Sequence, residues 1–174
     1  MKRAGRAAAV AITVAFAASS WWGAARAAET PMVRAAADAT SPRIGATVTV
    51  TVKIRSAHNT GSVPFTLVYD PRILEFVAAR SVEGGFLSKD GSHTSFLATS
   101  AAQNGGLRGV VVGLSRLRSD KGVGGKGTLC KLVFRALAPG VSPLAFARAT
   151  VLDPAASSMA ADFRGGSITV RPSP

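Results

Sequence analysis

Apolar and polar residues alternate along much of this chain, which is the pattern of β-strands with one buried face. In the stretch 47–55 (TVTVTVKIR), valine and isoleucine occupy every second position, and threonine or a basic residue occupies the positions between. A second run, VPFTLVYDPRILEF at 63–76, is interrupted by Asp70 and Pro71 and then resumes. Because an Asp-Pro pair favours a turn that the aspartate caps, this run predicts two strands joined by a corner.

More strands are expected along the rest of the chain, separated by turn residues. The Asn104-Gly105 pair predicts a hairpin, four glycines predict a loop at 119–127, and Phe86 and Leu87 are expected to tuck against the core from a loop of their own. The expected strands are 47–55, 63–69, 74–80, 94–99, 107–117, 129–137, 143–152 and 167–171. With no convincing amphipathic helix, the pattern predicts an all-β fold, a single β-sandwich of about nine strands.

The first 27 residues have the organisation of a secretory signal peptide. A basic start is followed by a short apolar run, and the small residues Ala25 and Ala27 form a cleavage site. The apolar run is too short for a membrane-spanning helix, which needs about 20 residues. We therefore expect an exported protein, secreted or periplasmic, with a signal peptide at 1–27, a flexible leader at 28–42 and one domain at 43–171.

The net charge of +12 narrows the choice of partners. Lys2, Arg3, Arg6 and Arg26 belong to the signal peptide, so the rest of the chain carries about +8. Nucleic-acid binding predicts basic residues interleaved with exposed aromatics, or a helix that carries them into a groove, and the sequence shows neither. An acidic partner or an anionic envelope surface is a milder inference from the same charge.

The sequence offers few groups for catalysis. Cys130 is the only cysteine and lies on the apolar face of its strand, so it is expected to be a small buried side chain. His58 and His93 show no metal-binding spacing, and no pair of carboxylates stands out for glycosidic cleavage. We expect no enzyme activity, no metal and no cofactor.

Four segments, in their order and spacing, resemble the cohesin domains of bacterial extracellular assemblies. They are GATVTVTVKI at 45–54, FTLVYDPRILEFV at 65–77, GTLCKLVFRALAPGVSPL at 127–144 and GGSITV at 165–170. The resemblance covers about residues 43–171 and implies a jelly-roll topology for the sandwich.

The resemblance also implies a function. Cohesins of cellulosomes are non-catalytic receptor modules that bind a dockerin, a small calcium-loaded helical module, through one flat face. It implies that this chain recognises a dockerin-like or another envelope or secreted protein, with a link to extracellular polysaccharide degradation. The contact face corresponds to 62–69 and 108–117. The expected partner-binding residues are Ser62, Pro64, Thr66, Val68, Arg108, Val110, Val112, Arg116 and Arg118.

The sequence departs from the cohesin pattern on this face. Ser62 and Pro64 stand where dockerin-binding cohesins commonly place polar hydrogen-bonding residues, and Arg116 stands where an acidic residue is common. A dockerin of the usual kind would lose hydrogen bonds here and meet an altered charge. We therefore expect the fold to be kept and the partner to be different.

Two alternative functions remain open. Cohesins share their sandwich with family 2 and 3 carbohydrate-binding modules, which typically stack sugar rings on a strip of exposed aromatics. Both tryptophans, Trp21 and Trp22, lie in the signal peptide, so the rest of the chain has few aromatic residues from which to form such a strip. A carbohydrate-binding module is the first alternative, and a structural subunit of an envelope or secretion assembly is the second.

Overall fold

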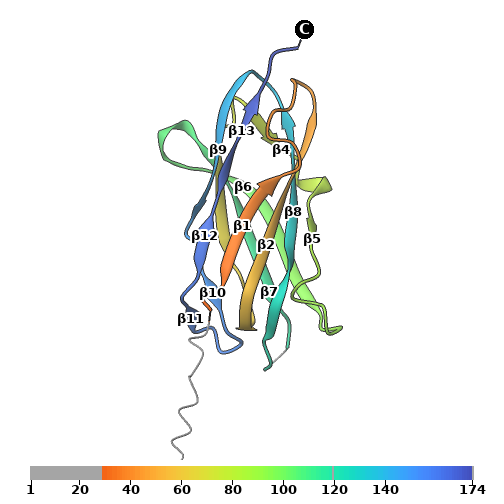
Figure 1. Cartoon of the computed structure of the whole chain (residues 1–174), viewed down its shortest axis with the longest axis vertical. Helices are drawn as coiled ribbons and strands as arrows, with labels where there is room; N and C mark the ends of the chain where they lie inside the picture. The colour runs from red at the N-terminus through yellow and green to blue at the C-terminus, as the bar shows by residue number, and fades with distance from the viewer. Residues whose placement is uncertain (1–28, 119, 174) are drawn as a thin grey trace, which may run out of the picture.

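The computed structural model describes residues 29–118 and 120–173. Within them the chain forms thirteen strands and two single-turn 3-10 helices, and the long strands pack as two facing sheets (Figure 1). The predicted all-β sandwich with jelly-roll topology is confirmed. The strands outnumber the expected nine because several are only two or three residues long. The predicted signal peptide at 1–27 lies outside the described residues.

The first sheet has the order β12-β1-β2-β8-β4, and β5 also pairs with β8. β2 and β8 run antiparallel to each other and are 14 residues long each, so they form the centre of this sheet. β1 pairs with β2 on one side and with β12 on the other. The strands are β1 (Met32–Ala37), β2 (Thr47–Thr60), β4 (Leu74–Phe76), β5 (Val82–Glu83), β8 (Val123–Ala136) and β12 (Asp162–Arg164).

The second sheet has the order β13-β9-β3-β7-β6. Each neighbouring pair in it is antiparallel. The strands are β3 (Phe65–Tyr69), β6 (Thr94–Ala102), β7 (Arg108–Arg116), β9 (Gly140–Ala147) and β13 (Gly166–Val170). A small two-stranded sheet joins β10 (Val151–Leu152) to β11 (Ser158–Met159), and the 3-10 helices are η1 (Ala78–Arg80) and η2 (Asn104–Gly106).

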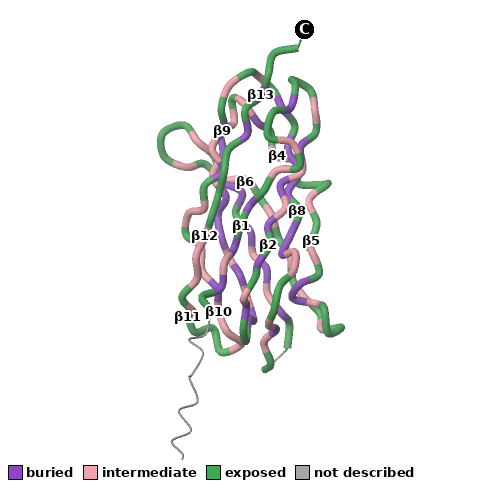
Figure 2. Tube along the Cα trace, in the orientation of Figure 1, coloured by how far each residue is buried: buried purple, intermediate pink, exposed green. Residues whose placement is uncertain are grey.

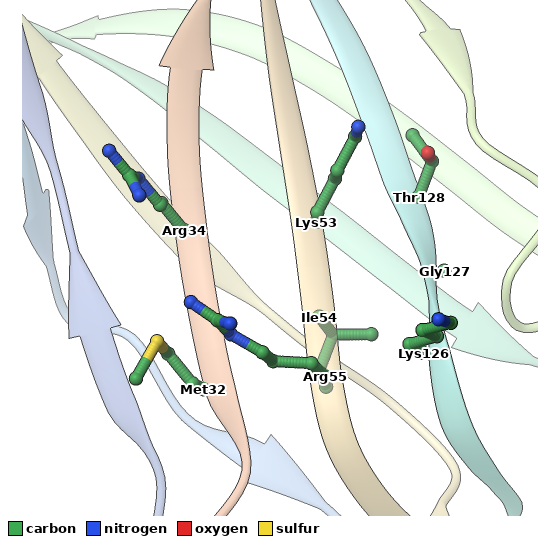
Figure 3. A pocket seen from close by; sticks show the side chains of 8 residues that line it. All are labelled: Met32, Arg34, Lys53, Ile54, Arg55, Lys126, Gly127 and Thr128. Atoms are coloured by element: carbon green, nitrogen blue, oxygen red, sulfur yellow. The ribbon is translucent and has the colours of Figure 1, made fainter.

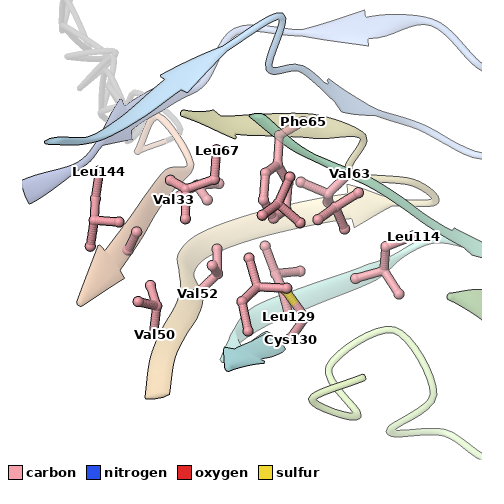
Figure 4. Close-up of a cluster of buried hydrophobic side chains, with 14 of the residues drawn as sticks. Val33, Val50, Val52, Val63, Phe65, Leu67, Leu114, Leu129, Cys130 and Leu144 are labelled. Atoms are coloured by element: carbon pink, nitrogen blue, oxygen red, sulfur yellow. The ribbon is translucent and has the colours of Figure 1, made fainter. Parts of the chain in front are cut away.

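The hydrophobic core lies between the two sheets, and each long strand contributes alternate side chains to it (Figures 2 and 4). The alternation predicted for 47–55 is confirmed, since the valines and the isoleucine of β2 are all buried. Tyr69 of β3 and Phe134 of β8 meet edge to face across the sandwich, with ring centroids 5.2 Å apart. Phe86 and Leu87 are buried, as predicted.

The Asp-Pro corner takes the chain from one sheet to the other. The backbone N–H groups of Ile73 and Leu74 donate to the Asp70 carbonyl, and the backbone N–H of Arg72 donates to Asp70 Oδ1 at 2.9 Å. The Arg72 guanidinium also binds both carboxylate oxygens, which lowers the pKa of Asp70. The predicted role of Asp70 as the cap of this turn is confirmed.

The flexible leader predicted at 28–42 is wrong for its middle part. Residues 32–37 form β1, which pairs along its whole length with β2 and buries Val33 and Ala35. This segment is rich in alanine and carries little intrinsic strand preference. It is a strand because β2 pairs with it along its whole length and β12 pairs with its first three residues.

Several other predicted boundaries also need correction, because β2 runs on to Thr60 and β6 to Ala102. The strand expected at 74–80 ends at Phe76, and the chain continues into η1. The loop expected at 119–127 is partly strand, because β8 begins at Val123 and its glycine-rich start pairs with the far end of β2. The strand expected at 143–152 begins earlier, at Gly140, and is divided between β9 and β10.

Candidate protein-docking face

The outer face of the sheet β13-β9-β3-β7-β6 is nearly free of charge, and we call it the uncharged face. Its five strands contain no aspartate or glutamate, and their only basic residues are Arg108 and Arg116 at the two ends of β7. The rest of the face consists of small, apolar and hydroxyl side chains. Such a surface loses little hydration free energy when a partner covers it.

Cross-strand pairing arranges these side chains in rows. Thr66 of β3 pairs with Val111 of β7, and Val111 pairs with Thr99 of β6. On its other side Thr66 pairs with Ala147 of β9. Because alternate residues of a strand share a face, the outward positions of β6 and β7 follow from this register. They are Ser95, Leu97, Thr99, Ala101, Gly109, Val111, Gly113 and Ser115.

Three apolar side chains project from the uncharged face. Leu97 on β6 is 64% exposed, Val141 on β9 is 60% exposed, and Val111 at the centre of β7 is 38% exposed. Most large apolar side chains of the described residues are instead at least partly buried. These three therefore supply the apolar contact area that a protein partner could cover.

A hollow of about 440 Å³ lies on this face, between β3 and the β6–β7 hairpin. At its edge, a Cβ on Gly109 would collide with the Thr66 methyl group and crowd the Gln103 side chain, so the glycine leaves room for both. Arg148, just beyond β9, lines the hollow and is exposed. The hollow is an open depression in the face, suited to receive one side chain of a partner.

The residues predicted on β3 and before it lie on or beside this face. Thr66 lines the hollow but is only 5% exposed, because its neighbours cover it. Pro64 lines the same hollow, and Val68 lies outward in partial exposure. The Ser62 hydroxyl is 2.7 Å from Ser115 Oγ and donates to the Leu114 carbonyl, so it is already used within the molecule.

The choice of Val110 and Val112 as contact residues needs correction. Their side chains are 0% and 1% exposed and face the core. Each pairs with an inward residue of β3, Leu67 and Phe65 respectively, so the opposite face of β7 carries Gly109, Val111 and Gly113. Three consecutive valines gave no alternation from which the outward face could be identified, and Val111 was missed for this reason. Leu97 was missed because it lies on β6, outside the expected contact face.

The choice of Arg116 as a contact residue also needs correction, because its side chain is buried and holds a loop in place. Its side chain is only 2% exposed. The guanidinium donates to both carboxylate oxygens of Asp90, at 3.0 and 2.7 Å, and to Ser92 Oγ and the Leu87 carbonyl. These bonds fix the 86–92 loop to β7 and lower the pKa of Asp90. Arg116 thus adds no charge to the uncharged face.

The two remaining predicted arginines lie at the margins. Arg108 is exposed at the start of β7 and donates to Ser100 Oγ, which also lies 2.8 Å from the Tyr69 hydroxyl. Arg118 is exposed in the turn after β7, with a positive φ of 51°. The structure therefore places Ser62, Pro64, Thr66 and Val68 on or beside one face, with Arg108 and Arg118 at its rim.

The groups that could support catalysis are few and separate. Burial raises the pKa of Cys130 to about 12, so this thiol is held protonated inside the core, as predicted for a small buried side chain. Among the described residues, no three His, Cys, Asp or Glu side chains cluster as metal ligands would. No helix in the same ranges is long and apolar enough to cross a bilayer.

A comparison of the sequence with models of known protein families identifies the family of this domain. The family model of the cohesin domain matches residues 33–170. The chain belongs to the cohesin domain family. Cohesins are non-catalytic binding modules, and the matched range includes every strand of both sheets except the first residue of β1. No curated protein sequence matches the chain significantly.

Solved cohesin structures share this fold at low sequence identity. A non-cellulosomal cohesin from the archaeon Archaeoglobus fulgidus is 20% identical with a TM-score of 0.63, covering 82% of this chain and 92% of the other. A type II cohesin from the cellulosome of Acetivibrio cellulolyticus is 15% identical with a TM-score of 0.64, covering 80% and 95%. The cohesin in a type I cohesin–dockerin complex from Clostridium thermocellum is 14% identical with a TM-score of 0.61, covering 83% of this chain and 95% of the other.

The structure gives little support to sugar stacking on aromatic rings. Among the described residues the exposed large apolar side chains are all aliphatic. Tyr69, Phe65, Phe86 and Phe134 are buried, and the other phenylalanines within the described residues pack against the core: Phe76, Phe96, Phe146 and Phe163. A planar aromatic strip of the cellulose-binding kind is therefore not formed by this part of the chain.

Proposed function

We propose that this cohesin is a receptor module that docks one protein partner on its uncharged face and performs no reaction. The observation that carries the proposal is the composition of that face: five strands without a carboxylate, with aliphatic side chains projecting between threonines and serines. Burying such a face costs little desolvation, and the preformed sheet loses little conformational entropy on binding.

The partner is inferred to be a dockerin-like module, or another secreted or envelope protein, with an uncharged contact surface. Support comes from family membership and from the type I cohesin structure solved in complex with a dockerin. The Ser62 hydroxyl is bonded internally and Arg116 is buried, so neither is available as a main contact. Affinity would therefore come mainly from apolar packing around Val111 and Leu97, while Arg108 and Arg148 at the rim would steer acidic groups.

The place of action is inferred to be outside the cytoplasm. The proposal rests on the signal peptide predicted at 1–27 and on structural relatives from cellulosomes. We further propose that the protein acts within an assembly that breaks down extracellular polysaccharide. A non-cellulosomal cohesin of equal similarity indicates that the same fold also occurs outside such assemblies.

Affinity capture tests this proposal. Purified protein is immobilised and exposed to the secreted and periplasmic fractions of its own organism, with and without a calcium chelator, and retained proteins are identified by mass spectrometry. Val111→Asp places a charge at the centre of the uncharged face and is expected to reduce retention at least about tenfold. Val82→Asp is the matched control, since Val82 is 50% exposed on the opposite sheet.

Each outcome is decisive. Retention of one protein that V111D loses and V82D keeps supports docking on the uncharged face, and its loss with the chelator identifies a calcium-loaded partner. Equal retention by both variants places the partner elsewhere and overturns the proposed site. Retention on insoluble polysaccharide with no protein partner overturns the receptor function itself.

A further inference from the structure

The outer face of the opposite sheet, unlike the uncharged face, carries several exposed basic side chains. Four basic side chains surround a hollow of about 390 Å³ on the sheet of β1, β2 and β8 (Figure 3). They are Arg34 from β1, Lys53 and Arg55 from β2, and Lys126 from β8, and all four are exposed. This concentration of positive charge lies on one continuous part of a single sheet.

The cross-strand register brings like charges together. Arg34 lies directly opposite Lys53 in the antiparallel β1–β2 pair. Like charges in this position destabilise a sheet. Repulsion of this kind is relieved when an anion lies between the two cations. An anion bound between Arg34 and Lys53 would therefore remove a repulsion that the free protein tolerates.

Other arginines of the same sheet have carboxylate partners. Arg135 binds Glu75 and Arg164 binds Asp162, at 2.6 and 2.7 Å. Within residues 29–118 and 120–173, no ion pair is formed by the four cations around the hollow. Their charge is thus available to a ligand.

The hollow continues along the strands. A second depression of about 240 Å³ also contains Arg34 and Lys53, and it extends past Ala36 and Thr51 to Asp38. The Asp38 carboxylate accepts a hydrogen bond from the backbone N–H of Thr49 and marks the end of the positively charged part. The two depressions share the Arg34–Lys53 pair, so together they form a narrow track along β1 and β2, which we call the basic track. Residues 53 and 55 of β2 lie about 6.8 Å apart along it, which places cations at intervals along one line.

We propose that the basic track binds a linear acidic polysaccharide, with sugar carboxylates between the basic side chains. A guanidinium donates two parallel hydrogen bonds to a carboxylate, and Arg34 and Arg55 provide two such groups. The hydroxyls of Thr51 and Thr128 line the depressions and match sugar hydroxyls.

The geometry favours this ligand over other polyanions. β2 is paired on both sides, and β1 is paired on both sides over Met32–Arg34, so the part of the track that carries the basic side chains offers no free strand edge to a peptide backbone. The exposed large apolar side chains of the described residues include no aromatic on which nucleic-acid bases could stack. Ile54 is buried and Met32 is half-buried, so the hollow presents no protruding apolar side chain for insertion into a bilayer.

The test measures binding of the purified protein to polygalacturonate at increasing salt. Dextran is the neutral control, and polyglutamate and phosphatidylglycerol vesicles represent the competing ligands. Arg34→Gln with Lys53→Gln is expected to weaken polygalacturonate binding about tenfold or more. Arg43→Gln with Arg171→Gln removes the same charge from exposed arginines outside the track and is expected to change binding less than about twofold.

Folding is checked in the same variants. The R34Q/K53Q variant is expected to melt no lower than the wild type, because the substitution removes repulsion. If it fails to fold, Arg55→Gln with Lys126→Gln decides the question, since both side chains are exposed at the rim of the hollow. Equal losses in track and control variants would show binding by net charge alone and overturn the proposal. Tighter binding to polyglutamate or vesicles than to polygalacturonate would overturn it as well.

Discussion

The two outer faces of this sandwich are built on the same pleated scaffold and yet differ sharply in the charge of their outward side chains. The uncharged face, on β13-β9-β3-β7-β6, carries aliphatic, small and hydroxyl groups. The opposite sheet carries the basic track and the ion pairs Arg135–Glu75 and Arg164–Asp162. Inward positions are constrained by the shared core, whereas outward positions are free to serve a ligand.

The difference indicates two kinds of recognition. An uncharged, rigid face gains affinity when apolar area is covered and depends little on salt. A hydrated basic track gains affinity from charge and weakens as salt rises. One small domain could thus hold a protein on one side and an acidic polymer on the other, and each interaction can be altered without the other.

The largest expected effect comes from the core that both faces share. Phe134 packs against Phe76 within its own sheet and against Tyr69 of the other. Phe134→Ala should lower the free energy of unfolding by about 3–5 kcal/mol, measured by urea denaturation. Leu137→Ala, just beyond β8 and 40% exposed, is the control and should cost far less. If F134A were no more costly than L137A, the two faces would not depend on one core.

A smaller effect is expected at Arg116, and it separates structure from recognition. Arg116→Gln removes the charged hydrogen bonds to Asp90 and Leu87, and should lower the free energy of unfolding by about 2 kcal/mol. Because the side chain is buried, partner affinity measured well below the melting temperature should stay unchanged. A loss of affinity as large as that of V111D would show that Arg116 is a contact residue after all.

The smallest expected effect is a loss of folding stability at acidic pH. The pKa of Asp90 is lowered by the Arg116 guanidinium and that of Asp70 by Arg72, so the unfolded chain binds more protons than the folded one below about pH 4. Stability is therefore full above that pH and falls as pH decreases. Melting temperatures measured from pH 7 to pH 3 should show this fall, and R116Q should show less of it. An identical fall in both proteins would contradict the role given to the Asp90–Arg116 pair.

Much of the fold could be predicted from local patterns. The alternation of 47–55 and the Asp-Pro corner lie in segments whose own residues determine their structure. β1 and the start of β8 could not be predicted, since alanine and glycine carry no strand preference. These segments become strands only through pairing with β2, which follows β1 in the chain but is distant in sequence from β8.

The candidate site was predicted less well, because its outward positions depend on register. Thr66 and Val68 follow from the alternation of β3, but β7 is apolar on both faces around Val111. Only pairing with β3 determines that Val110 and Val112 face inward. The basic track was not predicted for the same reason, since Arg34 and Lys53 meet only across β1 and β2.

The most direct test of the central claim is hydroxyl-radical footprinting of the protein with its captured partner. Leu97, 64% exposed on the uncharged face, and Val82, 50% exposed on the opposite sheet, are aliphatic side chains that the radical can reach. We predict that the partner protects Leu97 from oxidation and leaves Val82 unchanged. Protection of Val82 with Leu97 still fully reactive would contradict docking on the uncharged face.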